Sequence, residues 1–151
     1  MKLAEALAER AALQKTIENT KRRLLRNAAV REGDAPAEDP QTLLLELYNA
    51  HERLLTLIQR INRTNMTAQL SDGQLLMDAL AARDTQKARD KILQDLVDAA
   101  TERQTSYAAC GHVVPTVNVS EIQKQADDYA KKYRILDCQI QEVNWNTQLA
   151  Y

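Results

Sequence analysis

The chain consists largely of four stretches in which apolar residues recur every three or four positions. These stretches cover residues 3–28, 44–61, 76–100 and 119–143. Alternating steps of three and four place the apolar side chains along one face of an α-helix, at the average period of a coiled coil. Each such face must be covered by another helix, because it otherwise leaves a long apolar stripe in water. The pattern therefore predicts an all-α fold of four long helices.

Turn-forming residues and helix caps separate these stretches. Pro36 and Pro40 follow the first stretch, and Asp39 is placed to cap a helix whose first residue is Pro40. Residues 71–74 and 120–123 match the capping box, in which the first and fourth residues bond each other's backbone amides. We therefore expect these two segments to open the third and fourth helices.

Short links between helices favour antiparallel neighbours, which predicts two helical hairpins. We expect the first hairpin over residues 2–64 and the second over residues 72–149, within one helical domain of residues 1–151. Residues 111–117 are rich in valine and are expected to form one short extended segment. The hairpins could close into a four-helix bundle within one chain, or other copies could complete them as in a coiled coil.

The second helix carries more apolar surface than one neighbour can cover. Its main row is Leu44, Leu47, His51, Leu54, Ile58 and Ile61. A second row of Leu45, Tyr48 and Leu55 widens the apolar face. Because one helix with two apolar rows has to contact more than one partner, we predict a homo-oligomer. The same surface leaves room for a further, unidentified protein partner.

The third helix, expected over residues 72–107, is weakly apolar in its middle, where charged residues crowd together. Met77, Leu80, Ile92 and Leu96 are expected to hold its two ends. Its core contacts should therefore come from the ends of the helix rather than from its centre.

Arg10, His51 and the adjacent pair Arg83 and Asp84 are candidates for polar positions within helix seams. A charge in a seam costs stability but selects one alignment of the helices. A metal site in a helical bundle would instead pair a His with a Glu three residues earlier. The residue three before His51 is Tyr48, so we interpret the four residues as determinants of register and predict no metal and no cofactor.

Two further clusters are candidates for a loop site or an interface. Asn62, Thr64 and Asn65 form the densest polar group in a segment expected to be a loop. Such side chains can fix a turn by bonding backbone amides, or they can line a ligand pocket. Asn144 and Trp145 lie near the end of the fourth helix, and Trp145 is the single tryptophan. It is expected to act either as an anchor between subunits or as the lid of the local core.

A nucleic-acid-binding arm is one alternative function, suggested by a basic end on the first helix. The basic residues are Lys21, Arg22, Arg23, Arg26 and Arg31, and the acidic residues that follow are Glu32, Asp34, Glu38 and Asp39. Basic residues in a last helical turn also complement the helix dipole. Because the acidic link offsets the basic end and the net charge is −1, the sequence argues against nucleic acid as a partner.

A metal-dependent all-α nucleotide hydrolase is a second alternative. Enzymes of that kind hold Mg²⁺ with acidic clusters on facing helices, which Asp95, Asp98, Asp127 and Asp128 could imitate. Their glutamates are more densely spaced than the acids of this chain, so solvated helix faces explain these residues better. The sequence also offers no nucleophile–base–acid set, and Cys110 is interpreted as structural.

Nothing in the sequence indicates a membrane or an export route. No stretch approaches the roughly 18 apolar residues of a membrane-spanning helix. The first ten residues include Glu and Arg, unlike the apolar core of a signal peptide. We therefore predict a cytoplasmic protein that does not bind membranes, with Cys110 and Cys138 as free thiols.

Several short strings resemble a known family. They are Arg31-Glu32-Gly33, Ile61-Asn62-Arg63-Thr64-Asn65, Asp72-Gly73, Arg83-Asp84, Leu136-Asp137 and Gln141-Glu142-Val143-Asn144-Trp145. Together they resemble the septicolysin-like family of small bacterial helical proteins of unknown function, over essentially the whole chain. The resemblance implies an all-helical fold without known catalytic residues, and the family name implies a cytolysin-like toxin. A pore-former needs a membrane-inserting segment, which these charged helices do not offer.

The features of the sequence favour one function over the alternatives. The patterns that the sequence contains are mainly apolar helix faces, not reactive groups or ligand-binding loops. We therefore predict a non-catalytic helical scaffold or interaction protein that assembles with copies of itself.

Overall fold

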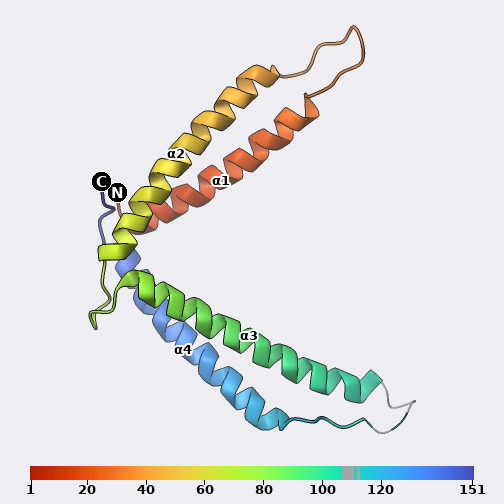
Figure 1. Ribbon diagram of the computed structural model, residues 1–151, viewed down its shortest axis with the longest axis vertical. Helices are drawn as coiled ribbons and strands as arrows, with labels where there is room; N and C mark the ends of the chain where they lie inside the picture. The colour runs from red at the N-terminus through yellow and green to blue at the C-terminus, as the bar shows by residue number, and fades with distance from the viewer. Residues whose placement is uncertain (107–110, 112) are drawn as a thin grey trace. The chain divides into compact units, whose positions relative to one another are not determined.

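The computed structural model describes residues 1–106, 111 and 113–151, and over these residues the chain forms four α-helices (Figure 1). The helices are α1 (Leu3–Arg26), α2 (Pro40–Thr67), α3 (Leu76–Ser106) and α4 (Val119–Asn146). Within the described residues there is no β-strand, only two isolated bridges between single residues. The predicted all-α fold is therefore confirmed.

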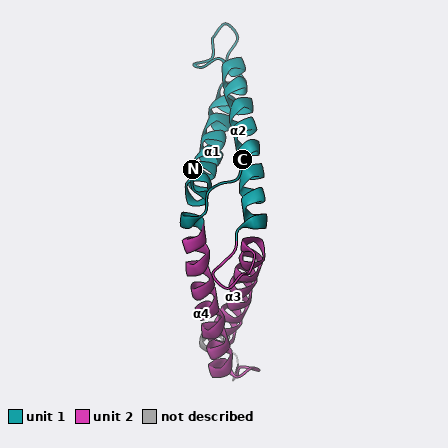
Figure 2. Ribbon diagram, turned by 90° about the vertical axis from the view of Figure 1, so that its left-hand side faces the viewer, with its two compact units in different colours: residues 1–68, 144–151 teal, residues 69–143 magenta. Residues whose placement is uncertain are grey.

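The helices belong to two compact units, shown in different colours in Figure 2. The first unit contains Met1–Ala68 and Asn144–Tyr151, and the second contains Gln69–Val143. Each unit holds one antiparallel hairpin, α1 with α2 and α3 with α4, as the short links predict (Figure 1). The last residues of the chain, expected in the second hairpin, belong to the first unit. One domain for the whole chain stays a prediction.

α2 begins where the sequence predicts, because Asp39 caps it. The Asp39 carboxylate accepts hydrogen bonds from the backbone N–H groups of Gln41 (3.3 Å) and Thr42 (3.0 Å) and from the Thr42 hydroxyl (2.7 Å). Pro40 fills the first helical position, where its missing N–H is not needed. The hydrogen bonds from the hydroxyl and backbone of Thr42, and from the backbone of Gln41, lower the pKa of Asp39.

α3 begins at Leu76, later than predicted, because residues 71–74 form a tight turn instead of a helix cap. Asp72 Oδ1 accepts the backbone N–H of Gln74 (3.0 Å), and Gly73 has a φ of +86°. Glycine adopts this left-handed conformation without the steric cost of a side chain. The capping-box interpretation of these residues is therefore wrong, since the same residue types also stabilise turns.

α4 begins at Val119, one residue before the predicted cap, Ser120. The side chain of Asn118 caps it instead, since Asn118 Oδ1 accepts the backbone N–H of Glu121 (3.2 Å). The preceding residues 113–117 lack regular secondary structure and border a cavity of about 210 Å³, whose other wall is Leu96, Ala99 and Ala100 of α3. Tyr107, Cys110 and His112 lie outside the described residues.

α1 and α2 meet along a seam in which buried or half-buried residues recur at every third or fourth position. The buried residues are Leu3, Ala6, Leu13 and Thr20 of α1 and Leu43, Leu57, Ile61 and Thr64 of α2. On α2 the half-buried Leu47, Ala50 and Leu54 complete this row. The sequence predicts His51 in place of Ala50, but His51 is exposed. Because apolar residues cover more than half of the circumference of α2, several rows fit the helical period and contact with α1 selects one.

In the second unit, the row of α3 that faces inward is more polar than predicted. Its buried and half-buried members are Leu76, Ala79, Arg83, Gln86, Asp90, Leu93, Val97 and Ala100. Met77, Ile92 and Leu96, which the sequence predicts as core contacts, are instead 46%, 66% and 37% exposed. The apolar rows of this helix are interrupted, so its periodicity does not determine which face is covered.

The two ends of the chain pack together within the first unit. The backbone N–H of Leu3 donates to the carbonyl oxygen of Thr147 (3.0 Å), and the N–H of Leu149 donates to the carbonyl oxygen of Met1 (3.0 Å). Leu149 is buried beside them, with 6% of its surface exposed. The C-terminal tail therefore closes the open end of the first hairpin.

Candidate functional site

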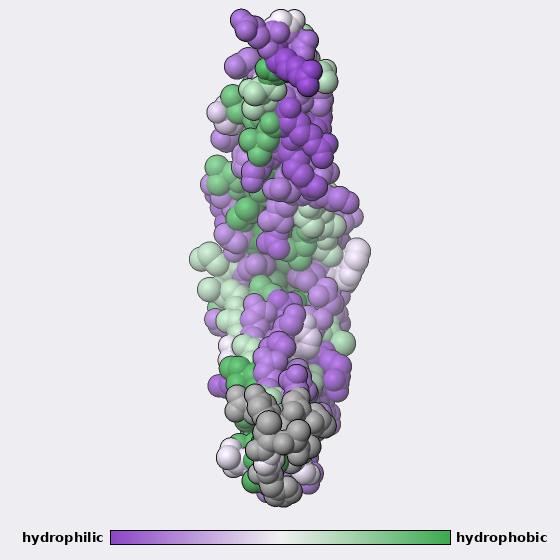
Figure 3. Space-filling model, turned by 90° about the vertical axis from the view of Figure 1, so that its right-hand side faces the viewer, coloured by the Kyte–Doolittle hydropathy of each residue, from purple (hydrophilic) through white to green (hydrophobic). Residues whose placement is uncertain are grey.

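The outer row of α2, which we define as Leu45, Tyr48, Glu52 and Leu55, contains three of the large apolar side chains that the structure leaves exposed. Leu45 is 60% exposed, Tyr48 57% and Leu55 50%. The steps of three, four and three residues place them on one face, opposite the seam with α1. On the molecular face drawn in Figure 3, hydrophobic side chains likewise reach the surface in patches among hydrophilic ones. The outer row thus has the spacing of a helix seam without a helix against it.

Leu44, His51 and Ile58 form one flank of the outer row. Leu44 and Ile58 are half-buried, whereas His51 is exposed. The Nδ1 atom of His51 lies 2.8 Å from the carbonyl oxygen of Leu47, so in the tautomer that carries a proton there the ring donates to its own helix. The structure therefore places His51 beside the outer row rather than in the seam with α1.

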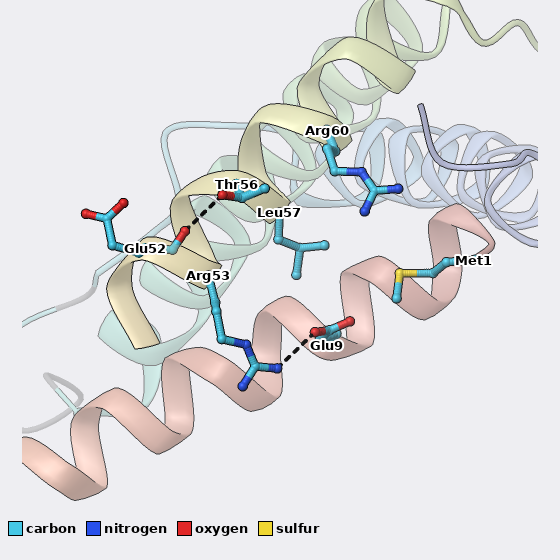
Figure 4. Close-up of a pocket in the computed structure, with 7 residues that line it drawn as sticks. All are labelled: Met1, Glu9, Glu52, Arg53, Thr56, Leu57 and Arg60. Carbon is cyan, nitrogen blue, oxygen red and sulfur yellow. Dashed lines mark hydrogen bonds and ion pairs between the residues drawn. The ribbon is translucent and has the colours of Figure 1, made fainter. Parts of the chain in front are cut away.

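The other side of α2 borders an open groove of about 360 Å³ between α1 and α2 (Figure 4). Its lining residues are Met1, Glu9, Glu52, Arg53, Thr56, Leu57 and Arg60. Arg53 and Glu9 form an ion pair across it at 3.5 Å, while the Glu52 carboxylate points away from this pair (Figure 4). Since 69% of the Arg53 side chain is exposed, the pair adds little stability.

Arg10 and Arg83 both occupy inward-facing rows, but in different units. Arg10 is half-buried in the seam row of α1, between Ala6 and Leu13. His51, predicted to share a polar layer with it, lies outside that seam. The structure therefore does not bring Arg10 and His51 into one buried layer, because Ala50 rather than His51 occupies that position of the α2 seam.

Arg83 links the two helices of the second hairpin. Its side chain is 22% exposed and donates to Asp84 on its own helix (2.9 Å) and to Asp137 on α4 (3.1 Å). Burial alone would lower the pKa of the Arg83 guanidinium, but hydrogen bonds to both carboxylates raise it above its ordinary value. This geometry suits a residue that sets the register of α3 against α4.

The polar character of this hairpin continues along α3. Gln86 Oε1 and Asp90 Oδ1 are buried atoms without a hydrogen-bond partner. Lys87 lies over the ring of Tyr133 (5.9 Å) and Arg89 over the ring of Tyr129 (5.5 Å), both on α4. Cation–π contacts of this kind replace part of the apolar packing that the middle of α3 lacks.

Asn62, Thr64 and Asn65, expected in a loop, lie in the last turns of α2, so the loop assignment is wrong. Thr64 is 2% exposed, and its hydroxyl donates to the carbonyl oxygen of Arg60 (2.9 Å) and accepts the backbone N–H of Ala150 (2.9 Å). Thr64 thus holds the C-terminal tail, whereas Asn62 is exposed and Asn65 half-buried. Polar residue types suggest a loop, but burial by the tail stabilises a helix here.

Asn144 and Trp145 end up in opposite environments at the end of α4. Asn144 is buried in the first unit with 6% of its surface exposed, while Trp145 is 63% exposed. Trp145 therefore does not form the lid of the core of its own chain. The role of Leu149 and Ala150 in closing the first unit has no local sequence signal, because it depends on contacts with residues near the start of the chain and in α2.

The basic end of α1 is largely paired with acids. Arg23 donates to Glu38 and lies 3.8 Å from Glu46, and Lys21 and Arg22 both pair with Glu18 at 3.9 Å. The hydrogen bond from Arg23 lowers the pKa of Glu38, and the Arg23 pKa is raised in turn. Much of the positive charge at this end is therefore matched within the chain.

Among the residues that the structure describes, no group of three His, Cys, Asp or Glu side chains is arranged to hold a metal ion. No helix in the described ranges combines the length and apolar character needed to cross a membrane. Cys138 carries an exposed thiol.

Comparisons with known proteins agree with this fold. A family model described as a family of unknown function (DUF6847) matches residues 10–149. The crystal structure of "a functionally unknown conserved protein from Corynebacterium diphtheriae" is 43% identical in sequence and superposes with a TM-score of 0.94, covering 99% of this chain and 98% of that one. No curated protein matches the chain.

These findings overturn the resemblance to septicolysin-like proteins, because nothing in them points to that family. Strings of two to five residues recur by chance in helical sequences, whereas the family model extends over most of the chain. The cytolysin-like activity that the resemblance implies has no support once the resemblance is removed. The chain belongs to the family of unknown function DUF6847.

Proposed function

We propose that this protein is a non-catalytic helical interaction protein that assembles with copies of itself through the outer row of α2. The supporting observation is the exposure of Leu45, Tyr48 and Leu55, each at least half exposed and all on one face of a helix. Scattered apolar side chains on a surface are ordinary. A row at the spacing of a helix seam is what a second helix would cover.

The size of the outer row favours an assembly that dissociates on dilution. Covering its half-exposed side chains contributes roughly 1 kcal/mol each, or roughly 6 kcal/mol from the three on each of two copies. Association costs about 4–15 kcal/mol of lost translational and rotational freedom. Contacts on the flank, such as Leu44 and Ile58, add to the favourable side. Because the gain from the outer row alone lies near the low end of this cost, the proposal requires the flank contacts as well and predicts a weak, reversible oligomer.

The molar mass in solution, measured by sedimentation equilibrium over a wide range of concentrations, tests this proposal. We expect a mass above that of the 17.1 kDa chain. Replacing Leu45 and Leu55 with Glu should yield a monomer with unchanged helical content, because buried carboxylates in the interface are costly.

Leu25→Glu is the matched control, since Leu25 is a 63% exposed leucine on α1 outside the outer row. This variant should keep the mass of the native protein. A monomeric native protein at every concentration, or an oligomer untouched by the double substitution, contradicts the proposal.

A further inference from the structure

We infer that two copies pack α2 against α2 in antiparallel orientation, with Leu45 opposite Leu55 of the partner subunit and Tyr48 opposite Glu52 of the partner subunit. This inference rests on the proposed self-assembly and adds the identity of the partner, the orientation of the helices and their register. The occupant of the outer row is then a second copy of this chain.

The outer row is self-complementary, which is what a two-fold interface requires. Leu45 and Leu55 are each five residues from Ala50, and Tyr48 and Glu52 are each two residues from it. A two-fold axis at the level of Ala50 therefore pairs leucine with leucine and tyrosine with glutamate. Each pairing then occurs twice, once on each side of the axis.

The chemistry of the row favours the antiparallel orientation over the parallel one. In a parallel pair in register, Glu52 would face Glu52 of the partner subunit, which places two like charges in a seam. In the antiparallel pair, each Glu52 carboxylate faces the phenol O–H of a tyrosine, which is a hydrogen-bond donor. The Glu52 carboxylate points away from Arg53 and Glu9 (Figure 4), so it is not engaged in their ion pair.

The flank of the row fits the same arrangement. Leu44 and Ile58 lie on one side of the row, near its two ends. The antiparallel orientation brings Leu44 of one copy close to Ile58 of the partner subunit. The segment from Leu44 to Ile58 is about 21 Å long at the rise of an α-helix. Beyond Leu55 the same face continues with the polar Gln59 and Asn62, so the apolar part of the interface ends there.

Disulfide cross-linking measures the orientation directly. We would place single cysteines at Leu45 and at Leu55 in a chain whose native cysteines are replaced by Cys110→Ser and Cys138→Ser, and oxidise with glutathione disulfide. The expected result is a cross-linked dimer when the L45C and L55C chains are mixed, and little dimer from either alone. In the antiparallel pair, two copies of L45C lie about 15 Å apart along the helices, beyond the reach of a disulfide.

Some outcomes contradict only the antiparallel arrangement, whereas others also contradict the proposed self-assembly. Strong cross-linking of L45C or L55C alone would show a parallel pair, and an oligomer that cross-links at neither position would show another interface. Either result overturns the inference and leaves self-assembly standing. A chain that is monomeric at all concentrations overturns both. L25C, placed on α1, is the control for random collisions.

The Tyr48–Glu52 pairing has its own test. Tyr48→Phe keeps the ring but leaves the Glu52 carboxylate of the partner subunit without its donor, and it should raise the dissociation constant about tenfold. Adding Glu52→Leu removes the unpaired charge and should restore or improve affinity. A dissociation constant that Tyr48→Phe leaves unchanged contradicts this register. Circular dichroism shows whether each variant retains its helices.

Discussion

Thr64 connects the C-terminal tail to α2 through one hydroxyl. The hydroxyl accepts the backbone N–H of Ala150 and donates to the carbonyl oxygen of Arg60, in a site that is 2% exposed. Thr64→Val preserves the shape but leaves the buried N–H unpaired. We expect the free energy of unfolding to fall by about 1–3 kcal/mol, measured by urea denaturation.

Thr85→Val is the control for this substitution. The Thr85 hydroxyl makes the same bond to the carbonyl oxygen four residues earlier, on Ala81, but Thr85 is exposed and receives no tail. Its replacement should change stability little. Equal effects at the two positions would mean that the bond to Ala150 contributes nothing of its own.

Asp39 makes the stability of the first hairpin depend on pH. Its pKa in the folded chain lies below the ordinary 3.8, because Thr42 and Gln41 donate hydrogen bonds to the carboxylate. The stabilisation by the Asp39 cap is therefore fully present when the pH is above the ordinary pKa. It is lost as the pH falls through the lower pKa of the folded chain. Asp39→Asn keeps a capping oxygen that cannot titrate.

We expect the unfolding free energy of Asp39→Asn to fall less steeply than that of the native chain as the pH falls below the ordinary pKa of 3.8. Urea denaturation at a series of pH values measures this slope. Asp34→Asn, in the same connection and exposed, should leave the slope as it is. Parallel curves for Asp39→Asn and the native chain would contradict the role of the cap.

At the scale of the helix pair, Arg83 and Asp137 join α3 to α4 in a half-buried seam. Arg83→Leu leaves the Asp137 carboxylate unpaired and should cost about 1–2 kcal/mol, less than a fully buried pair would. Asp137→Leu leaves Arg83 paired with Asp84 and should cost less than Arg83→Leu. The double substitution should recover part of the loss, since leucines can pack against each other there. A thermodynamic cycle from urea unfolding measures the coupling, and strict additivity would mean that the pair does not act as a unit.

The periodicity of α2 shows how far sequence reasoning reaches at this scale. The spacing of its leucines predicts a helix with two apolar rows, and the structure contains such a helix with Leu45, Tyr48 and Leu55 exposed. The spacing also predicts His51 in the seam, where the structure has Ala50. Neighbouring rows on a helix this apolar differ little in hydrophobicity, so the choice depends on how side chains of α1 fit between them.

At the scale of the whole molecule, the packing of the two chain ends against each other stabilises the first unit. Leu149 is 6% exposed and is far in sequence from the hairpin that it covers. Leu149→Ala should lower the unfolding free energy by about 2–4 kcal/mol, because it opens a cavity in a buried site. Leu25→Ala, at a leucine that is 63% exposed, is the control and should cost far less. Similar losses at both positions would show that the tail does not close the unit.

Features that depend on neighbours within a few positions can be predicted from the local sequence. The four helices follow from apolar residues at steps of three and four, and the start of α2 follows from Asp39 and Pro40. Both are local, because helical hydrogen bonds and caps join residues no more than four apart.

The remaining features depend on long-range packing. It selected the row of α2 that faces α1 and buried Thr64 beneath Ala150, 86 residues away. Residues so far apart leave no periodic trace in a sequence, and a capping pattern is shared by turns and helices. The packing of α1 against α2 and of the C-terminal tail against Thr64 provides this long-range information.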